Sequence, residues 1–219
     1  FALPSLGRQR LRPGAMIPPL PERLRGLRDI HTHRRENNPA ALVSLLPEEA
    51  AEFAATRPDT LFSAGIHPWE PYISPEEEDR RFAVLSAALL HGNTAAIGET
   101  GLDALKGPDA AIQEERFRRH IALSEALGLP LIIHLVKAQQ QLLAIRKEVS
   151  PTQPWIIHGF RGKAQQADQL AKAGLYISFG ERFNPDALTA VPAPQRLAET
   201  DESPLPIDAI TASHAQALR

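Results

Sequence analysis

The chain has 219 residues, and 24 Lys and Arg against 26 Asp and Glu give it a formal net charge of −2. With 43% hydrophobic residues it can bury a sizeable core, which excludes disorder for most of its length. The near balance of charge excludes a polybasic coat for nucleic acid, but not a small basic site. The absence of cysteine excludes disulfides, thiolate zinc sites and a thiol nucleophile.

Neither a membrane span nor a secretory signal is visible in the sequence. The longest apolar runs, such as 83–90, are far shorter than the roughly 20 residues that a spanning helix needs. The first 30 residues hold six arginines but no long apolar stretch. We therefore expect a cytoplasmic protein. Because Met16 is the only methionine, we expect residues 1–15 to be an upstream segment and residues 16–219 to form one domain.

Short apolar runs bounded by turn residues predict eight strands. Near-continuous apolar strands of this kind are typical of a parallel sheet that is buried on both faces. The predicted strands are residues 27–31, 41–46, 61–66, 95–98, 131–135, 155–158, 175–179 and 196–199.

Helical patterns lie mainly between the later strands, at 75–91, 110–127, 137–148 and 163–173. In 110–127 we expect one buried face, formed by Ile112, Phe117, Ile121, Ser124 and Leu127. Gly128 would end that helix. The charged run 76–81 would be a solvated helix face. Between the first three strands the helices are weak or missing, and Pro47 restricts any helix there to 48–56.

Alternating strands and helices predict either an α/β barrel or a doubly wound open sheet. His, Glu and Asp recur at the carboxyl ends of strands all along the chain. Only a barrel brings all of those ends to one pocket, whereas the outermost strands of an open sheet would lie too far apart. We therefore expect a TIM-like barrel of seven or eight parallel strands.

Six of these strand-end residues carry side chains that can bind a metal, namely His31, His33, Glu99, His134, His158 and Asp201. Each alone has an ordinary alternative: a core or surface histidine, a turn glutamate, or a loop aspartate. Asp103 is expected to be a turn or helix-cap residue, and Glu199 could be buried. Together, four imidazoles and two carboxylates suit a hydrolytic site in which two cations, about 3.5–4 Å apart, activate a water.

The motifs DIHTH, GIHPW, AIGETGLD, LPLIIH, IIHGFRGKAQQADQLAKAGLYISFG and LAETDESPL occur in this order along the chain. Over roughly residues 28–206, the chain resembles the TatD family of metal-dependent deoxyribonucleases, within the amidohydrolase-like superfamily. The resemblance implies a TIM-like barrel that binds two divalent cations, Mg²⁺, Mn²⁺ or Zn²⁺, and hydrolyses phosphodiester bonds in DNA.

The resemblance also implies a role for each residue of these motifs. His31, His33, Glu99 and Asp201 would hold one cation, and Glu99 would bridge to a second, held also by His134 and His158. Asp201 would in addition orient or deprotonate the attacking water. His67, in GIHPW, would lie beside the substrate phosphate.

The chain departs from the family pattern at three positions. Val136 stands where the family usually has Arg, Gly159 where it often has Cys, and Trp69 where a second His or an acid is common. None of these changes removes a predicted metal ligand. They bear instead on the size of the substrate and on the affinity for DNA.

Cations that follow the strand ends could meet phosphates as a local patch, or could simply be solvated. They are Arg34, Arg35, Lys137, Arg161, Lys163 and Arg182, of which Lys137 and Arg161 are the predicted substrate-binding residues. Trp69 and Phe160 could stack on a terminal base.

Two alternatives remain. The first is a small-molecule phosphoesterase or an amidohydrolase on the same metal frame. The second is a barrel that binds a metal or a partner without turnover. The glutamate within GETGLD favours the nuclease family, so we expect DNA or a small phosphoester as substrate and no obligate protein partner.

Overall fold

The computed structural model describes residues 17–219, and the predicted upstream segment 1–15 lies outside the described residues. Eight parallel strands form one sheet, with neighbours in chain order from β1 to β8. The strands are β1 (Asp29–Thr32), β2 (Ala41–Leu45), β3 (Leu61–Ala64), β4 (Thr94–Asp103), β5 (Leu131–Val136), β6 (Trp155–Ile157), β7 (Tyr176–Phe179) and β8 (Arg196–Ala198).

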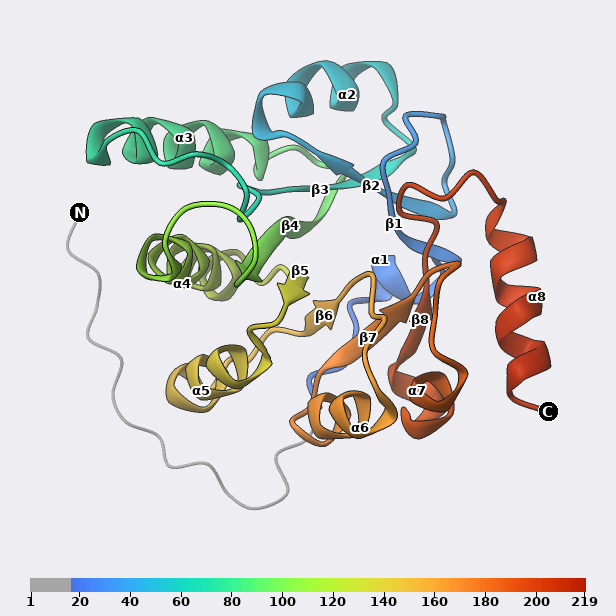
Figure 1. Ribbon diagram of the computed structural model, residues 1–219. Coiled ribbons are helices and arrows are strands. Elements are labelled where there is room, and N and C mark those ends of the chain that lie inside the picture. The colour runs from blue at the N-terminus through green and yellow to red at the C-terminus, as the bar shows by residue number, and fades with distance from the viewer. Residues whose placement is uncertain (1–16) are drawn as a thin grey trace.

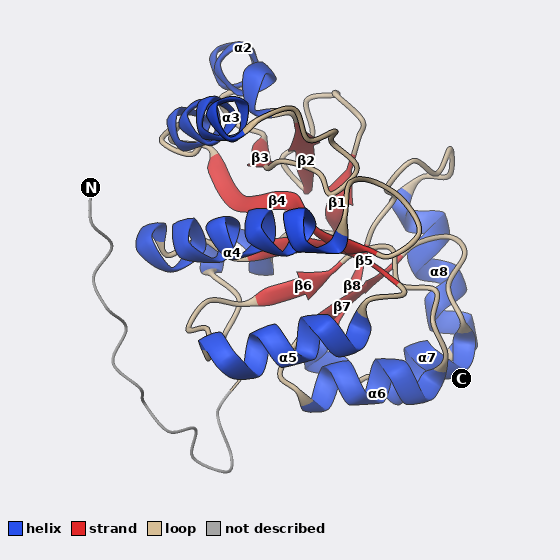
Figure 2. Ribbon diagram, turned by 60° about the vertical axis from the view of Figure 1, so that its left-hand side comes forward, coloured by secondary structure: helices blue, strands red, loops and turns tan. Residues whose placement is uncertain are grey.

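Helices lie around the outside of the strands (Figures 1 and 2). They are α1 (Glu22–Arg25), α2 (Ala50–Thr56), α3 (Pro75–Ala88), α4 (Ala110–Leu127), α5 (Gln139–Val149), α6 (Ala164–Lys172), α7 (Pro185–Ala190) and α8 (Ile207–Ala217), with 3₁₀ turns at Pro47–Glu49 and Ala193–Gln195. The short α1 is the exception, because it lies within the ring of strands in Figure 1. Every helix within residues 17–219 is too short or too polar to cross a lipid bilayer.

The sheet closes between β1 and the segment that follows β8. The Asp201 N–H donates to the His31 carbonyl at 2.9 Å, and the His33 N–H donates to the Asp201 carbonyl at 3.2 Å. Beside this bridge the Asp29 carboxylate accepts from the backbone N–H of Thr200 at 2.9 Å and from its hydroxyl at 2.7 Å. The closed sheet is a TIM-like barrel, as the position of the polar residues predicts.

The apolar core has two layers, one inside the barrel and one between the strands and the helices. Side chains from six strands meet inside the barrel, among them Ile30, Leu42, Ile132 and Ile156. Leu24 of α1 packs onto the same cluster, so this helix closes the amino-terminal end of the barrel. The other end stays open for a site.

All eight predicted strands are present. The prediction that helices between the first three strands are weak or missing is also confirmed, since only a 3₁₀ turn and the short α2 lie there. Three expectations about the elements were wrong or only partly right. The fourth strand runs to Asp103 rather than ending at residue 98, so Glu99 lies within it. Leu127 of α4 is 41% exposed, whereas Gln113, Arg116 and His120 are buried.

The charged run 76–81 is also only partly a solvated face. Glu78 is 6% exposed and forms an ion pair with the buried Arg116. The other expected feature of α4 is confirmed, since Gly128 ends the helix in the left-handed conformation with φ 67°.

Candidate metal centre

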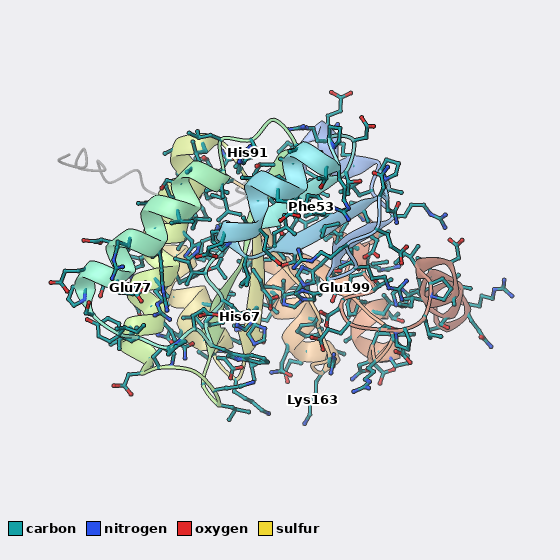
Figure 3. The ribbon with its side chains drawn as sticks, turned by 90° about the horizontal axis from the view of Figure 1, so that it is seen from above. Phe53, His67, Glu77, His91, Lys163 and Glu199 are labelled. Carbon is teal, nitrogen blue, oxygen red and sulfur yellow. The ribbon has the colours of Figure 1, made fainter. Side chains whose placement is uncertain are left out.

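The structure brings the six predicted metal ligands together at the carboxyl ends of the strands. His31 lies in β1, Glu99 in β4 and His134 in β5, while the other three, His33, His158 and Asp201, follow β1, β6 and β8. Figure 3 shows this end of the barrel below the middle of the view, where His67 and Lys163 are labelled, and His91, which precedes β4, at the top. An open cleft of about 1300 Å³ lies over the site.

Two glycines allow β4 to pack close against β5 on either side of Glu99. Gly98 and Gly101 have φ values of 147° and 141°. A β-carbon on either one would collide with a carbonyl oxygen of β5, that of Ile132 or of His134. The glycines flanking Glu99 in the sequence therefore place its carboxylate in the middle of the barrel mouth.

The two oxygens of the Glu99 carboxylate face different sets of histidines. Oε2 lies 3.5 Å from Nε2 of His31 and 3.7 Å from Nε2 of His33. Oε1 lies 2.7 Å from Nε2 of His158 and 2.9 Å from Nδ1 of His134. The carboxylate is 6% exposed and separates two groups of donor atoms.

Asp201 belongs to the first of these two groups. Its Oδ1 lies 3.7 Å from Nε2 of His31 and 3.6 Å from Nε2 of His33. The residue has a left-handed backbone with φ 53°, held by the two hydrogen bonds that close the barrel. The same backbone contacts that complete the fold therefore fix this carboxylate beside the histidine pair.

The charge states of the central residues favour a cation. Burial holds the pKa of His31 well below its usual range, so this imidazole is neutral, and neither ring nitrogen has a hydrogen-bond partner within the described chain. Burial raises the pKa of Glu99, but the attraction of His158 and hydrogen bonds from three histidines outweigh it and set the pKa well below the usual range. A neutral, unpaired buried imidazole beside an ionised carboxylate is a donor set that suits a divalent metal.

The pKa of His158 also indicates that the buried carboxylates require a positive charge beside them. Burial lowers its pKa, but the charge of Glu99 and the hydrogen bonds of Glu99 and Glu199 outweigh burial, so the pKa lies well above the usual range. A proton on this ring supplies the positive charge that the buried carboxylates require. A divalent cation beside Glu99 can supply that charge instead.

Two further carboxylates lie behind the histidines of the second group. Oδ2 of Asp103 is 3.1 Å from Nε2 of His134, and Oε1 of the fully buried Glu199 is 3.7 Å from Nδ1 of His158. Such outer carboxylates commonly orient metal-binding histidines. Asp103 also accepts from the Leu105 N–H, as its predicted turn role requires, but its contact with His134 was missed. For Glu199, the one local signal in the sequence was its alternation with Asp201.

The three predicted substrate-binding residues lie around this cluster. His67, which follows β3, has Nε2 at 2.9 Å from Oε1 of Glu99. Arg161 is half exposed, with a guanidinium nitrogen 4.0 Å from Oδ2 of Asp201. Lys137 follows β5 with a left-handed backbone of φ 53°, and both cations line the cleft.

Some of the other side chains considered for nucleic acid are already engaged within the protein. Arg34 donates to the carbonyls of Ser203 and Leu205, and Arg35 pairs with Glu49. Phe160 is 8% exposed and packs on Phe179, so the expectation that it stacks on a base was wrong.

A parallel eight-stranded barrel with His, Glu and Asp donors gathered at its carboxyl end defines a class of proteins, the TIM-like barrels with a potential metal site at the mouth. Comparisons with known proteins identify the family within this class. Residues 35–212 match the family described as TatD related DNase. The chain therefore belongs to the TatD family.

Individual relatives agree with this assignment. The chain is 31% identical over 160 residues to the uncharacterized metal-dependent hydrolase YcfH of Escherichia coli K12, with 68% of this chain and 58% of YcfH covered. It is 29% identical over 170 residues to a protein of Cronobacter sakazakii named 3′-5′ ssDNA/RNA exonuclease TatD, and the match covers 70% of this chain and 61% of that protein. The chain thus spans less than two thirds of either relative.

A solved structure confirms the fold. The crystal structure of YJJV, a TatD homologue from Escherichia coli K12, matches with a TM-score of 0.66 at 21% identity, over 89% of this chain and 95% of that one.

Proposed function

We propose that this protein is a hydrolase that cleaves phosphodiester bonds in DNA, and that it would do so at a centre of two divalent cations bridged by Glu99. The observation that carries the proposal is the division of the Glu99 carboxylate, with Oε2 facing His31 and His33 and Oε1 facing His134 and His158. One carboxylate placed between two donor groups is the arrangement that a bridged pair of cations needs.

Each cation would have its own ligands. His31, His33, Asp201 and Oε2 of Glu99 would hold the first, and His134, His158 and Oε1 of Glu99 would hold the second. When bound, the two cations would lower the pKa of a water and stabilise the charge that develops on the phosphoryl oxygens. Mg²⁺, Mn²⁺ and Zn²⁺ all accept such a mixed set of imidazole and carboxylate ligands.

Protein side chains would position the substrate and take the proton from the water. Oδ1 of Asp201 faces the histidine pair, whereas Oδ2 lies on the side of Arg161. We assign Oδ2 as the acceptor of the water proton. His67 Nε2, next to Glu99, would donate to a phosphoryl oxygen, and Arg161 and Lys137 at the cleft wall would bind flanking phosphates.

DNA as the substrate is supported by the family and by the form of the cleft. The Cronobacter relative is named as an exonuclease for single-stranded DNA and RNA. The cleft is open, and Arg161 and Lys137 on its walls can meet a chain of phosphates.

The test is cleavage of a 5′-labelled single-stranded DNA by protein stripped of metal and then supplied with Mg²⁺, Mn²⁺ or Zn²⁺. We expect metal-dependent shortening from the 3′ end, and at least a 100-fold lower rate in Glu99→Gln, in line with the loss of one preorganised group at the reacting centre, worth about 10²–10³. Glu148→Gln is the matched control, because Glu148 is an exposed carboxylate on α5.

Parallel assays with a small phosphodiester, a carboxylic ester and an amide identify the alternatives. Metal-dependent turnover of the small phosphodiester without DNA cleavage would indicate a phosphoesterase. Turnover of the amide or the ester alone would indicate an amidohydrolase. Folded, metal-loaded protein that hydrolyses none of these would contradict the hydrolytic centre itself.

A further inference from the structure

Trp69 lines the cleft and is 42% exposed, but its indole is also held by neighbouring side chains. Its indole N–H donates to Oδ2 of Asp103 at 2.7 Å. One face of the ring is covered by the Lys106 ammonium, 3.3 Å from the ring centroid. The ring meets the imidazoles of His67 and His134 edge to face, at centroid distances of 4.7 and 5.3 Å.

The carboxylate that Trp69 holds is the one behind His134. Oδ2 of Asp103 lies 3.1 Å from Nε2 of His134, and Oδ1 accepts from the Leu105 N–H at 2.8 Å. The backbone of Asp103 is fixed by Gln113 of α4, whose side chain accepts from the N–H at 2.7 Å and donates to the carbonyl at 2.9 Å. Asp103 is therefore held in one position by its backbone and by both oxygens.

His134 lies between two carboxylates, and their relative strength as hydrogen-bond acceptors determines which ring nitrogen carries the proton. Nδ1 faces Oε1 of Glu99 at 2.9 Å, and Nε2 faces Asp103. With a cation bound beside Oε1, the neutral imidazole of His134 would carry one proton, and a strong acceptor at Nε2 would keep that proton there and leave the lone pair on Nδ1 for the cation.

We propose that Trp69 and Asp103 are positioning residues of the metal centre. The indole N–H holds the Asp103 carboxylate against Nε2 of His134, so that Nδ1 presents its lone pair to the second cation beside Oε1 of Glu99. This inference rests on the proposed two-cation function.

The variant that tests the proposal most directly is Trp69→Phe, because it keeps an aromatic ring between His67 and His134 but removes the N–H donor. Trp155→Phe is the matched control. Trp155 is the only other tryptophan of the chain, and its buried indole N–H has no partner among residues 17–219. Asp103→Asn replaces the carboxylate acceptor with a side chain of similar size. It still tests the proposal if Trp69→Phe has a folding defect.

Zinc binding to metal-free protein is the first readout. Wild type and Trp155→Phe should bind two Zn²⁺ with the same pair of affinities. Trp69→Phe and Asp103→Asn should bind one Zn²⁺ normally and the other about 10–100-fold more weakly, which is the usual cost of losing an outer partner of a metal-binding histidine. Cleavage should fall at limiting metal and recover largely when metal is saturating.

The proton on Nε2 of His134 gives a second readout that a packing role would not affect. In the zinc-loaded protein it should give a downfield resonance, assigned by its absence in His134→Gln, because it bonds to a carboxylate. The resonance should persist in Trp155→Phe and move upfield in Trp69→Phe and Asp103→Asn.

Equal zinc affinities, within twofold, of Trp69→Phe and wild type would overturn the proposal, as would equal weakening of both sites together with a lower unfolding temperature. Failure of the proposed function is a separate outcome. Wild type that binds two Zn²⁺ but does not cut DNA would refute the substrate, whereas wild type that binds only one would refute the bridged pair.

Discussion

The buried ion pair between Arg116 of α4 and Glu78 of α3 offers a sharp test of how the site is supported. Nε of Arg116 lies 2.6 Å from Oε2 of Glu78, and both side chains are less than one tenth exposed. The same guanidinium donates to the carbonyls of Glu70 and Pro71, in the loop that carries His67 and Trp69. One arginine therefore neutralises a buried acid and holds a loop of the site.

We predict that Arg116→Met destabilises the protein by about 3–5 kcal/mol, because it leaves the Glu78 charge buried without a partner and two carbonyls without a donor. For a chain of this size each kcal/mol lowers the unfolding temperature by roughly 2–4 °C. Urea and thermal unfolding at pH 7 measure the loss.

The matched control lies two residues along the same helix. Arg118 pairs with Glu114 and Glu148 at the surface, so Arg118→Met should cost less than about 1 kcal/mol. The double variant Glu78→Met with Arg116→Met should be more stable than Arg116→Met alone, since no unpaired charge stays buried. A cost below about 1 kcal/mol for Arg116→Met, or no gain in the double variant, would refute this reasoning.

Three further predictions concern pH, backbone and metal. Burial lowers the pKa of His120 from 6.5 to about 4. The unfolded imidazole binds its proton at a higher pH than the folded one, so stability falls as the pH falls from about 6.5 to 4, by about 3 kcal/mol in total, and His120→Gln should remove this part of the dependence in unfolding titrations. Gly101→Ala should lower stability by more than about 2 kcal/mol in urea unfolding, because its methyl group would meet the carbonyl of His134, whereas Gly92→Ala has open space and should not. Metal at 100 times its dissociation constant should stabilise the wild type by about 2.7 kcal/mol in thermal scans, and Glu99→Gln should lose most of that gain.

The strands, and the clustering of the predicted ligands, could be predicted from the sequence because their signals are local. An apolar run that ends in a histidine or an acid marks both a strand and its carboxyl end, and barrel closure brings those ends together. Asp201 illustrates this, since its place after the last apolar run was enough to put it beside His31.

The buried polar face of α4 was missed although the sequence holds a signal for it. At about 100° per residue, Gln113 lies only about 40° around the helix from Phe117, whereas Ile112 lies about 140° away. Periodicity alone therefore favours burial of Gln113 over Ile112. Burial of an arginine is costly unless partners exist, and the partners of Arg116 come from α3 and the loop before it, which no local pattern reveals.

The same distinction explains why the roles of Asp103 and Trp69 were missed. A metal ligand is marked by its own chemistry and its strand end, but an orienting residue is defined only by the atom that it contacts on another element. Asp103 fulfils its predicted turn role through Oδ1, and its second oxygen reaches His134 only because β4 extends five residues past Gly98 alongside β5. The two glycines that permit this close pairing thus place both Glu99 and the carboxylate that orients its neighbour. The geometry of the candidate metal centre therefore depends on the backbone of one strand as much as on the histidines around it.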